Sequence, residues 1–135
     1  AASQERINQA RRVRKQFGGG MRQIGILAAA GLYALERNLG RLAEDHQRAK
    51  RLAQGLTQMK GVNLDPEEVE TNIVIFDLSP SGLTPAQAQA ELESAGARVV
   101  IFGPTHLRAV LHLDIDDQAL DQALTAMSKV LDRAG

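Results

Sequence analysis

The sequence predicts a helical N-terminal part followed by an α+β domain with a short, mainly antiparallel sheet. Residues 4–60 carry apolar side chains at three- and four-residue spacing, which is typical of helices. Residues 72–113 instead contain short apolar and β-branched runs between Gly and Pro residues, which is typical of strands and turns. Short strands with helices on one face indicate an α+β sandwich.

Composition restricts the class of protein further. The chain has 135 residues, three Phe, one Tyr and no Trp, so its core is made mainly of Leu, Ile, Val and Ala. The formal net charge is zero, which gives the whole chain no electrostatic attraction to nucleic acid or membranes. The absence of cysteine excludes a disulfide framework and a thiolate nucleophile. No signal peptide and no apolar run of roughly 20 residues is visible, so we expect a cytoplasmic protein.

The N-terminal 60 residues are expected to be helical. A basic helix over 4–16 has one narrow apolar stripe and no evident N-cap residue. A second pattern runs from residue 21 to residue 60, as one long helix or as two helices bent at Gly40. The Lys60-Gly61 pair is predicted to end this pattern, because glycine is the common residue just after a helix.

Strands and helices alternate in the remaining residues. Strands are predicted over 62–64, 72–78, 98–102 and 107–113. One helix is predicted from Thr84, with Pro85 at its first position, to residue 94. Asp116 or Asp117 caps a last helix, whose apolar residues share one face.

The stretch from Arg14 to Gln23 contains three successive glycines between cationic side chains. Arg14, Lys15 and Arg22 bracket a backbone without Cβ atoms, and a helix pattern opens directly after it. Free N–H groups at a helix start beside Gly20 are one way to bind an anion. A flexible joint with solvated charges is the alternative, and these residues alone leave both open.

Arg108 is the candidate binding residue in the second half. It stands inside an apolar strand, where a charged group either faces water from an edge strand or is held by a partner. Its planar fork suits bidentate binding of a carboxylate. His112, two residues later, is interpreted as structural, and no histidine has a second ligand at metal spacing. The Asp114, Asp116 and Asp117 group is interpreted as a helix cap.

Two long segments resemble the low-specificity L-threonine aldolase family. They are RKQFGGGMRQ at 14–23 and GILAAAGLYAL at 25–35, and shorter similarities lie at 41–46, 70–74 and 107–114. The likeness runs from about Arg6 to the end of the chain. It implies the aspartate-aminotransferase-like fold of pyridoxal phosphate enzymes (fold type I, α/β overall), with this chain as its C-terminal part. Residues 1–20 would be the end of the large domain with the glycine turn, 21–60 the connecting helix or helices, and 61–135 the small α+β domain.

The resemblance also implies an activity and a set of site residues. The family cleaves β-hydroxy-α-amino acids, such as L-threonine and L-allo-threonine, to glycine and an aldehyde by retro-aldol cleavage of the Cα–Cβ bond. By position, Arg108 would bind the substrate α-carboxylate, and Lys15 would be a polar contact near the active site. Arg22 would reach a cofactor phosphate, that of its own or of a neighbouring subunit. The Schiff-base lysine of the family stands in a Ser-Lys-Gly segment, and none of the four lysines here has that context. No catalytic residue is therefore expected in this chain, which would be inactive alone.

The partners implied are the N-terminal portion of the same enzyme, the amino acid substrate, and further copies in a homo-oligomer, either a tetramer or a dimer. Nucleic acid and membrane are not expected as partners. A stand-alone α+β small-molecule-binding or regulatory module without catalysis is the alternative. A nucleic-acid binder that uses the basic residues 6–22 is disfavoured, because no aromatic residues are interleaved with the charges.

Overall fold

The computed structural model describes residues 2–132 and divides the chain at Gly40. Ala1–Gly40 form one unit and Arg41–Gly135 the other, and each is described by itself. The division falls where the sequence predicts a bend. The domain boundaries predicted at residues 20 and 60 stay a prediction. No helix among residues 2–132 is long and apolar enough to cross a membrane.

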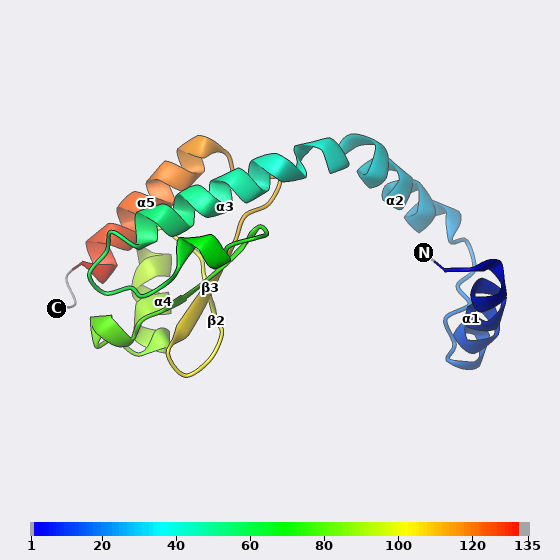
Figure 1. The fold of residues 1–135 in the computed structure, drawn as a ribbon, viewed down its shortest axis with the longest axis horizontal. Helices are drawn as coiled ribbons and strands as arrows, with labels where there is room; N and C mark the ends of the chain where they lie inside the picture. Colours follow the sequence, from blue (N-terminus) through cyan, green and yellow to red (C-terminus); the bar gives the residue numbers. More distant parts are fainter. Residues whose placement is uncertain (1, 133–135) are drawn as a thin grey trace. The chain divides into compact units, whose positions relative to one another are not determined.

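The two units contain five α-helices, three short 3₁₀ helices and three strands in the described part of the chain (Figure 1). In chain order they are α1 (Gln4–Gln16), α2 (Gly25–Arg37), η1 (Leu39–Arg41), α3 (Leu42–Leu56), η2 (Pro66–Glu68), β1 (Ile73–Asp77), η3 (Ser79–Ser81), α4 (Pro85–Ser94), β2 (Val100–Ile101), β3 (His106–Val110) and α5 (Asp117–Leu131).

The first unit consists of α1 and α2, neither of which has a buried residue. The predicted bounds of the basic helix are confirmed by α1. The expectation that it lacks an N-cap is wrong, because the Ser3 hydroxyl accepts the N–H of Arg6 at 3.4 Å. The second helix, α2, is apolar nearly all round and still exposed, as Ile26 at 78% shows. A helix of that composition is normally covered in a folded protein.

The predicted pattern over 21–60 is two helices, α2 and α3, joined by the short η1. The first of them starts at Gly25 rather than at residue 21, because Gln23 has a φ of 52° and interrupts the helical backbone. The second ends at Leu56, before the predicted stop at Gly61. Gly61 has another role: a Cβ there would lie 2.5 Å from the carbonyl oxygen of Leu131, so close packing against α5 requires glycine.

The sheet is antiparallel, with the strand order β1-β3-β2, which confirms the predicted α+β class. The strand predicted over 62–64 is wrong: only one bridge forms, between Asn63 and Asp77. It extends no further because Pro66 follows at the start of η2 and lacks a backbone donor. The strand β2 has two residues rather than the predicted five.

The predicted helix caps are present, as Thr84 forms a capping box with Gln87 and Asp116 accepts the N–H of Ala119.

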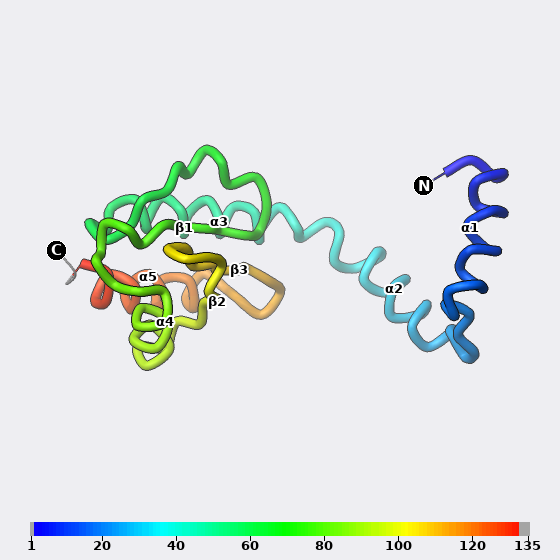
Figure 2. Tube along the Cα trace, turned by 90° about the horizontal axis from the view of Figure 1, so that it is seen from below, coloured from blue at the N-terminus to red at the C-terminus, as the bar shows by residue number. Residues whose placement is uncertain are grey.

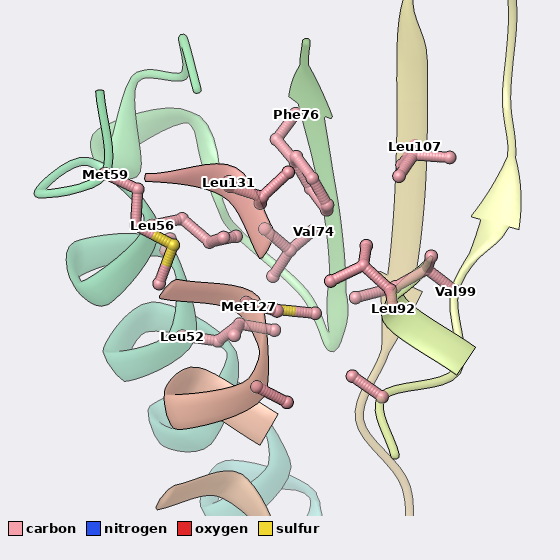
Figure 3. Packing of buried hydrophobic residues seen from close by; sticks show 14 of the residues in the cluster. Leu52, Leu56, Met59, Val74, Phe76, Leu92, Val99, Leu107, Met127 and Leu131 are labelled. Carbon is pink, nitrogen blue, oxygen red and sulfur yellow. The ribbon is translucent and has the colours of Figure 1, made fainter. Parts of the chain in front are cut away.

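The core lies between one face of the sheet and the helices α3, α4 and α5. Figures 1 and 2 show α3 and α5 side by side. Figure 3 shows Leu52, Met127 and Leu131 on these helices pointing toward Val74 and Phe76 of β1. Side chains alternate between the two faces of a strand, so the residues between these core positions lie on the opposite face of the sheet.

An ion-pair network joins α3 to the beginning of α5. Its centre is Asp45, which is only 4% exposed and pairs with Arg41 at 3.4 Å and with Arg48 at 3.8 Å. The Nε of Arg48 also donates to Asp117 Oδ1 at 3.1 Å. This hydrogen bond raises the pKa of Arg48 above its ordinary value. Asp117 therefore links two helices, and Asp116 alone provides the cap of α5.

Candidate functional site

The face of the sheet away from the helices carries Arg108 on its central strand. Ile75 of β1 lies directly opposite on one side, and Val100 of β2 lies opposite on the other. Both aliphatic side chains remain partly exposed, Ile75 at 38%. The neighbours of Arg108 along β3 are buried in the core, so its side chain rises from the open face. The edge-strand interpretation of Arg108 is wrong, because β3 is paired on both sides.

The guanidinium of Arg108 has no acceptor within the described residues. Its Nε is shut off from solvent and has no hydrogen-bond partner. A buried polar group left unpaired costs about 1–3 kcal/mol of stability. An arginine in this state can bind an anion without first giving up a partner in the protein. The arrangement therefore suits recognition of a carboxylate that approaches the open face of the sheet.

Phe102 lies beside this guanidinium. The centroid of its ring is 5.7 Å from Cζ of Arg108, which is within the range of a cation–π interaction. Its backbone N–H donates to the carbonyl of His106 at 2.9 Å, in the hairpin between β2 and β3. Phe102 was not among the predicted site residues. Alternation places it on the same face as Val100, but only the register of β2 against β3 shows that this is also the face of Arg108.

A hollow of about 580 Å³ opens on the same face of the sheet, next to Ile75. Ile73 and Ile75 form an apolar floor, and Asp77, His106 and the segment 63–69 contribute the rim. Asp77 accepts hydrogen bonds from the hydroxyl and the N–H of Ser79 at 2.7 and 3.0 Å. These bonds lower the pKa of Asp77 below its ordinary value. Arg108 does not line this hollow; its link to the hollow is Ile75, which forms part of the floor and lies opposite Arg108 on the neighbouring strand.

The glycine turn belongs to the first unit and has a defined structure. Gly18 has a φ of 72° and donates to the carbonyl of Lys15 at 3.2 Å, while Gly19 donates to that of Arg14 at 2.8 Å. This hydrogen-bond pair is the Schellman motif that ends a helix. A Cβ on Gly20 would lie 3.0 Å from Nζ of Lys15. The first two glycines therefore end α1, and the third lets the Lys15 ammonium lie against the backbone.

Arg22 lies two residues beyond this turn. It is exposed and forms no hydrogen bond or ion pair with residues 2–132. The predicted helix start directly beside Gly20 is wrong, because α2 begins at Gly25. Lys15 and Arg22 thus flank the same turn, whereas Arg108 belongs to the other unit and is described there alone.

Two further positions lie close to the end of β3. The side-chain amide of Asn72 donates to the carbonyl of Leu111, which ties β1 to the segment after β3. His112 lies beyond the strand, and its Nδ1 accepts the N–H of Asp114 at 3.3 Å. Both contacts stabilise local backbone structure.

Comparisons with known proteins identify the family of the chain and several relatives. Residues 1–79 match the family model of the β-eliminating lyases. The chain is 40% identical over 130 residues to low-specificity L-threonine aldolase 1 of Arabidopsis thaliana, which covers 96% of the chain and 36% of that protein. It is 40% identical over 114 residues to the low specificity L-threonine aldolase of Escherichia coli K12; this match covers 84% of the chain and 32% of that protein. It is also 36% identical over 133 residues to alanine racemase TOXG of Cochliobolus carbonum; this match covers 93% of the chain and 32% of that protein.

The chain spans about a third of the length of these curated relatives, and it corresponds to their C-terminal third. The family model covers more than half of the chain. The chain therefore belongs to the β-eliminating lyase family, whose members depend on pyridoxal phosphate, and its homologues over most of its length include low-specificity L-threonine aldolases.

Proposed function

We propose that this chain is the C-terminal part of a pyridoxal-phosphate-dependent threonine aldolase that binds the substrate, and that Arg108 binds the substrate α-carboxylate. The observation that carries the proposal is the guanidinium of Arg108, which lies on the open face of the central strand with its Nε buried and unpaired. A carboxylate supplies two oxygens in the geometry of the arginine fork. The proposed substrates are β-hydroxy-α-amino acids such as L-threonine, which are cleaved to glycine and an aldehyde.

The names of the relatives support a role for this region in binding an amino acid. They include threonine aldolases and an alanine racemase, whose names refer to different reactions. Threonine and alanine share the α-carboxylate and the α-amino group. A region similar in all of these proteins is suited to recognise a shared group, and an arginine suits the carboxylate. Fixing the carboxylate also fixes the direction of the Cα–Cβ bond, and such orientation is a large part of enzymatic rate enhancement.

The glycine turn fits the phosphate group of the cofactor. The Lys15 ammonium lies against the bare backbone of Gly20, and the guanidinium of Arg22 has no partner in the described part of the chain. Cationic donors beside an accessible backbone are suited to a phosphate. Arg22 would hold the phosphate, of its own or a neighbouring subunit, and Lys15 would be a polar contact near the substrate. When bound, the cofactor supplies an electron sink for the bond that breaks.

The complete enzyme would add an N-terminal portion with the lysine that carries the cofactor, and would assemble as a homo-oligomer. The surface of α2 supports such partners. Leu27, Leu32 and Leu35 are each more than half exposed, together with Ile26. A helix that is apolar all round is stable in water only when other protein covers it.

The test of Arg108 is a kinetic comparison in the complete, cofactor-loaded enzyme. Hydrogen bonds to charged groups contribute about 1.5–3 kcal/mol, so Arg108→Gln should lower kcat/KM for L-threonine by roughly 10- to 150-fold. Arg98→Gln is the matched control, because the Arg98 side chain is 89% exposed and its one ion pair is long at 3.9 Å. Equal kinetics for the two variants would remove Arg108 from the substrate site.

The test of Arg22 is cofactor retention. Arg22→Ala should raise the dissociation constant of pyridoxal phosphate, measured by equilibrium dialysis of the complete enzyme. Arg12→Ala is the control, because Arg12 is an exposed residue of α1. A dissociation constant that is the same in both variants would leave Arg22 without a role in holding the phosphate.

A further inference from the structure

We propose that Phe102 is a positioning residue that holds the guanidinium of Arg108 ready for the substrate carboxylate. The inference rests on the proposed function of Arg108. Its observation is the 5.7 Å distance between Cζ of Arg108 and the centroid of the Phe102 ring. Phe102 is 51% exposed, so it is not a core residue. Cζ of Arg108 lies over the face of its ring.

Hydrogen bonds hold the backbone of the hairpin that contains Phe102. Its N–H donates to the carbonyl of His106 at 2.9 Å, which closes the hairpin. Gly103 follows with a φ of 153°, a conformation that side-chain-bearing residues rarely adopt. The carbonyl of Thr105 then accepts the N–H of Leu78 at 2.8 Å and ties the hairpin to the end of β1. The aromatic ring therefore projects from a hairpin loop whose backbone is hydrogen-bonded on both sides of Gly103.

An aromatic partner suits this task better than an acidic one. A carboxylate beside Arg108 would occupy its N–H donors and compete with the substrate. A ring attracts the guanidinium through its face and leaves the N–H groups free. In the structure, Arg108 has this aromatic contact and no ion pair among the described residues. The substrate would then bind an arginine whose side chain is already ordered, which lowers the entropy cost of binding.

The experiment compares ring-removing and ring-keeping variants in the complete, cofactor-loaded enzyme. Cation–π contacts of about 0.5–1 kcal/mol correspond to roughly two- to fivefold in affinity, and lost side-chain order adds to this. Phe102→Leu should therefore raise both KM for L-threonine and the dissociation constant of glycine by about three- to tenfold, with kcat within about twofold. Phe102→Tyr, which keeps an aromatic ring, should leave both values as in wild type. Leu113→Ala is the control, since Leu113 has a similar exposure of 56% and lies beyond β3.

A double-mutant cycle separates positioning from a general effect on the fold. In an Arg108→Gln background, Phe102→Leu should leave the dissociation constant of glycine unchanged, because there is no cation left to position. Equal effects of Phe102→Leu in both backgrounds, or equal values for the Leu and Tyr variants, would overturn the inference. If Arg108→Gln alone behaved as wild type, the proposed function itself would fail. If it were impaired while Phe102→Leu was not, only the role of Phe102 would fail.

Discussion

Replacement of Arg108 by methionine should stabilise the chain while it removes the proposed function. The Nε of Arg108 is buried without a partner between Ile75 and Val100, and an unpaired donor of this kind costs about 1–3 kcal/mol. Methionine removes that donor and keeps a flexible apolar stem for the contacts with the two aliphatic side chains. The cation–π contact with Phe102 is lost at the same time, at about 0.5–1 kcal/mol.

The difference between these terms predicts a gain of about 1 kcal/mol in the free energy of unfolding. The assay is urea unfolding of the chain, followed by far-UV circular dichroism, with the same m-value required for both proteins. Arg98→Met is the control, because an exposed substitution should stay within about 0.5 kcal/mol of wild type. If Arg108→Met instead lowered the free energy of unfolding by more than about 1 kcal/mol, the guanidinium would support the fold. The reasoning from its unpaired Nε would then be refuted.

Two further predictions concern charged groups of the second unit. Asp45→Ala should lower the free energy of unfolding by about 2 kcal/mol, because Arg41 and Arg48 lose a buried partner but still reach water. Asp121→Ala, which removes an exposed ion pair, should cost at most about 1 kcal/mol in the same urea experiment, and equal losses would contradict the central place of Asp45. The pKa of Asp77 is lowered in the folded state by its bonds to Ser79, so its contribution to stability is present above the unfolded-state pKa of about 3.9 and is lost as pH falls through the folded value. Asp77→Asn should therefore be less stable than wild type at pH 5 and should lose less stability below pH 4, and parallel pH profiles would exclude this linkage.

Local signals in the sequence were sufficient for several elements of the fold. The capping box at Thr84 and the N-cap at Asp116 are formed by residues within one helical turn, and both are present. The strand β1 follows from a short apolar run with β-branched residues. Gly61 shows the limit of such signals. It has the sequence position of a helix-ending glycine, but contact with Leu131, which is distant in sequence, determines the need for it.

The candidate site could be predicted only in part for the same reason. An arginine inside an apolar run identified Arg108 from the sequence alone. Its environment depends on strand order, because β3 is the central strand and brings Ile75 and Val100 to either side. The contact with Phe102 depends on the register of a hairpin, which no local pattern specifies. Lys15 and Arg22 were identified through the glycine turn between them, and their roles stay predictions.

The most direct test of the role of Arg108 is the binding of ligands with and without a carboxylate. Dissociation constants of glycine and of 1-amino-2-propanol, which is threonine without its carboxylate, would be measured for the complete enzyme and for its Arg108→Gln variant. Loss of one partner of a charge-assisted pair predicts that glycine binds about 10- to 150-fold more weakly to the variant, while the affinity for the amine is unchanged. Equal changes for the two ligands, or unchanged binding of glycine, would contradict the assignment of Arg108 to the α-carboxylate.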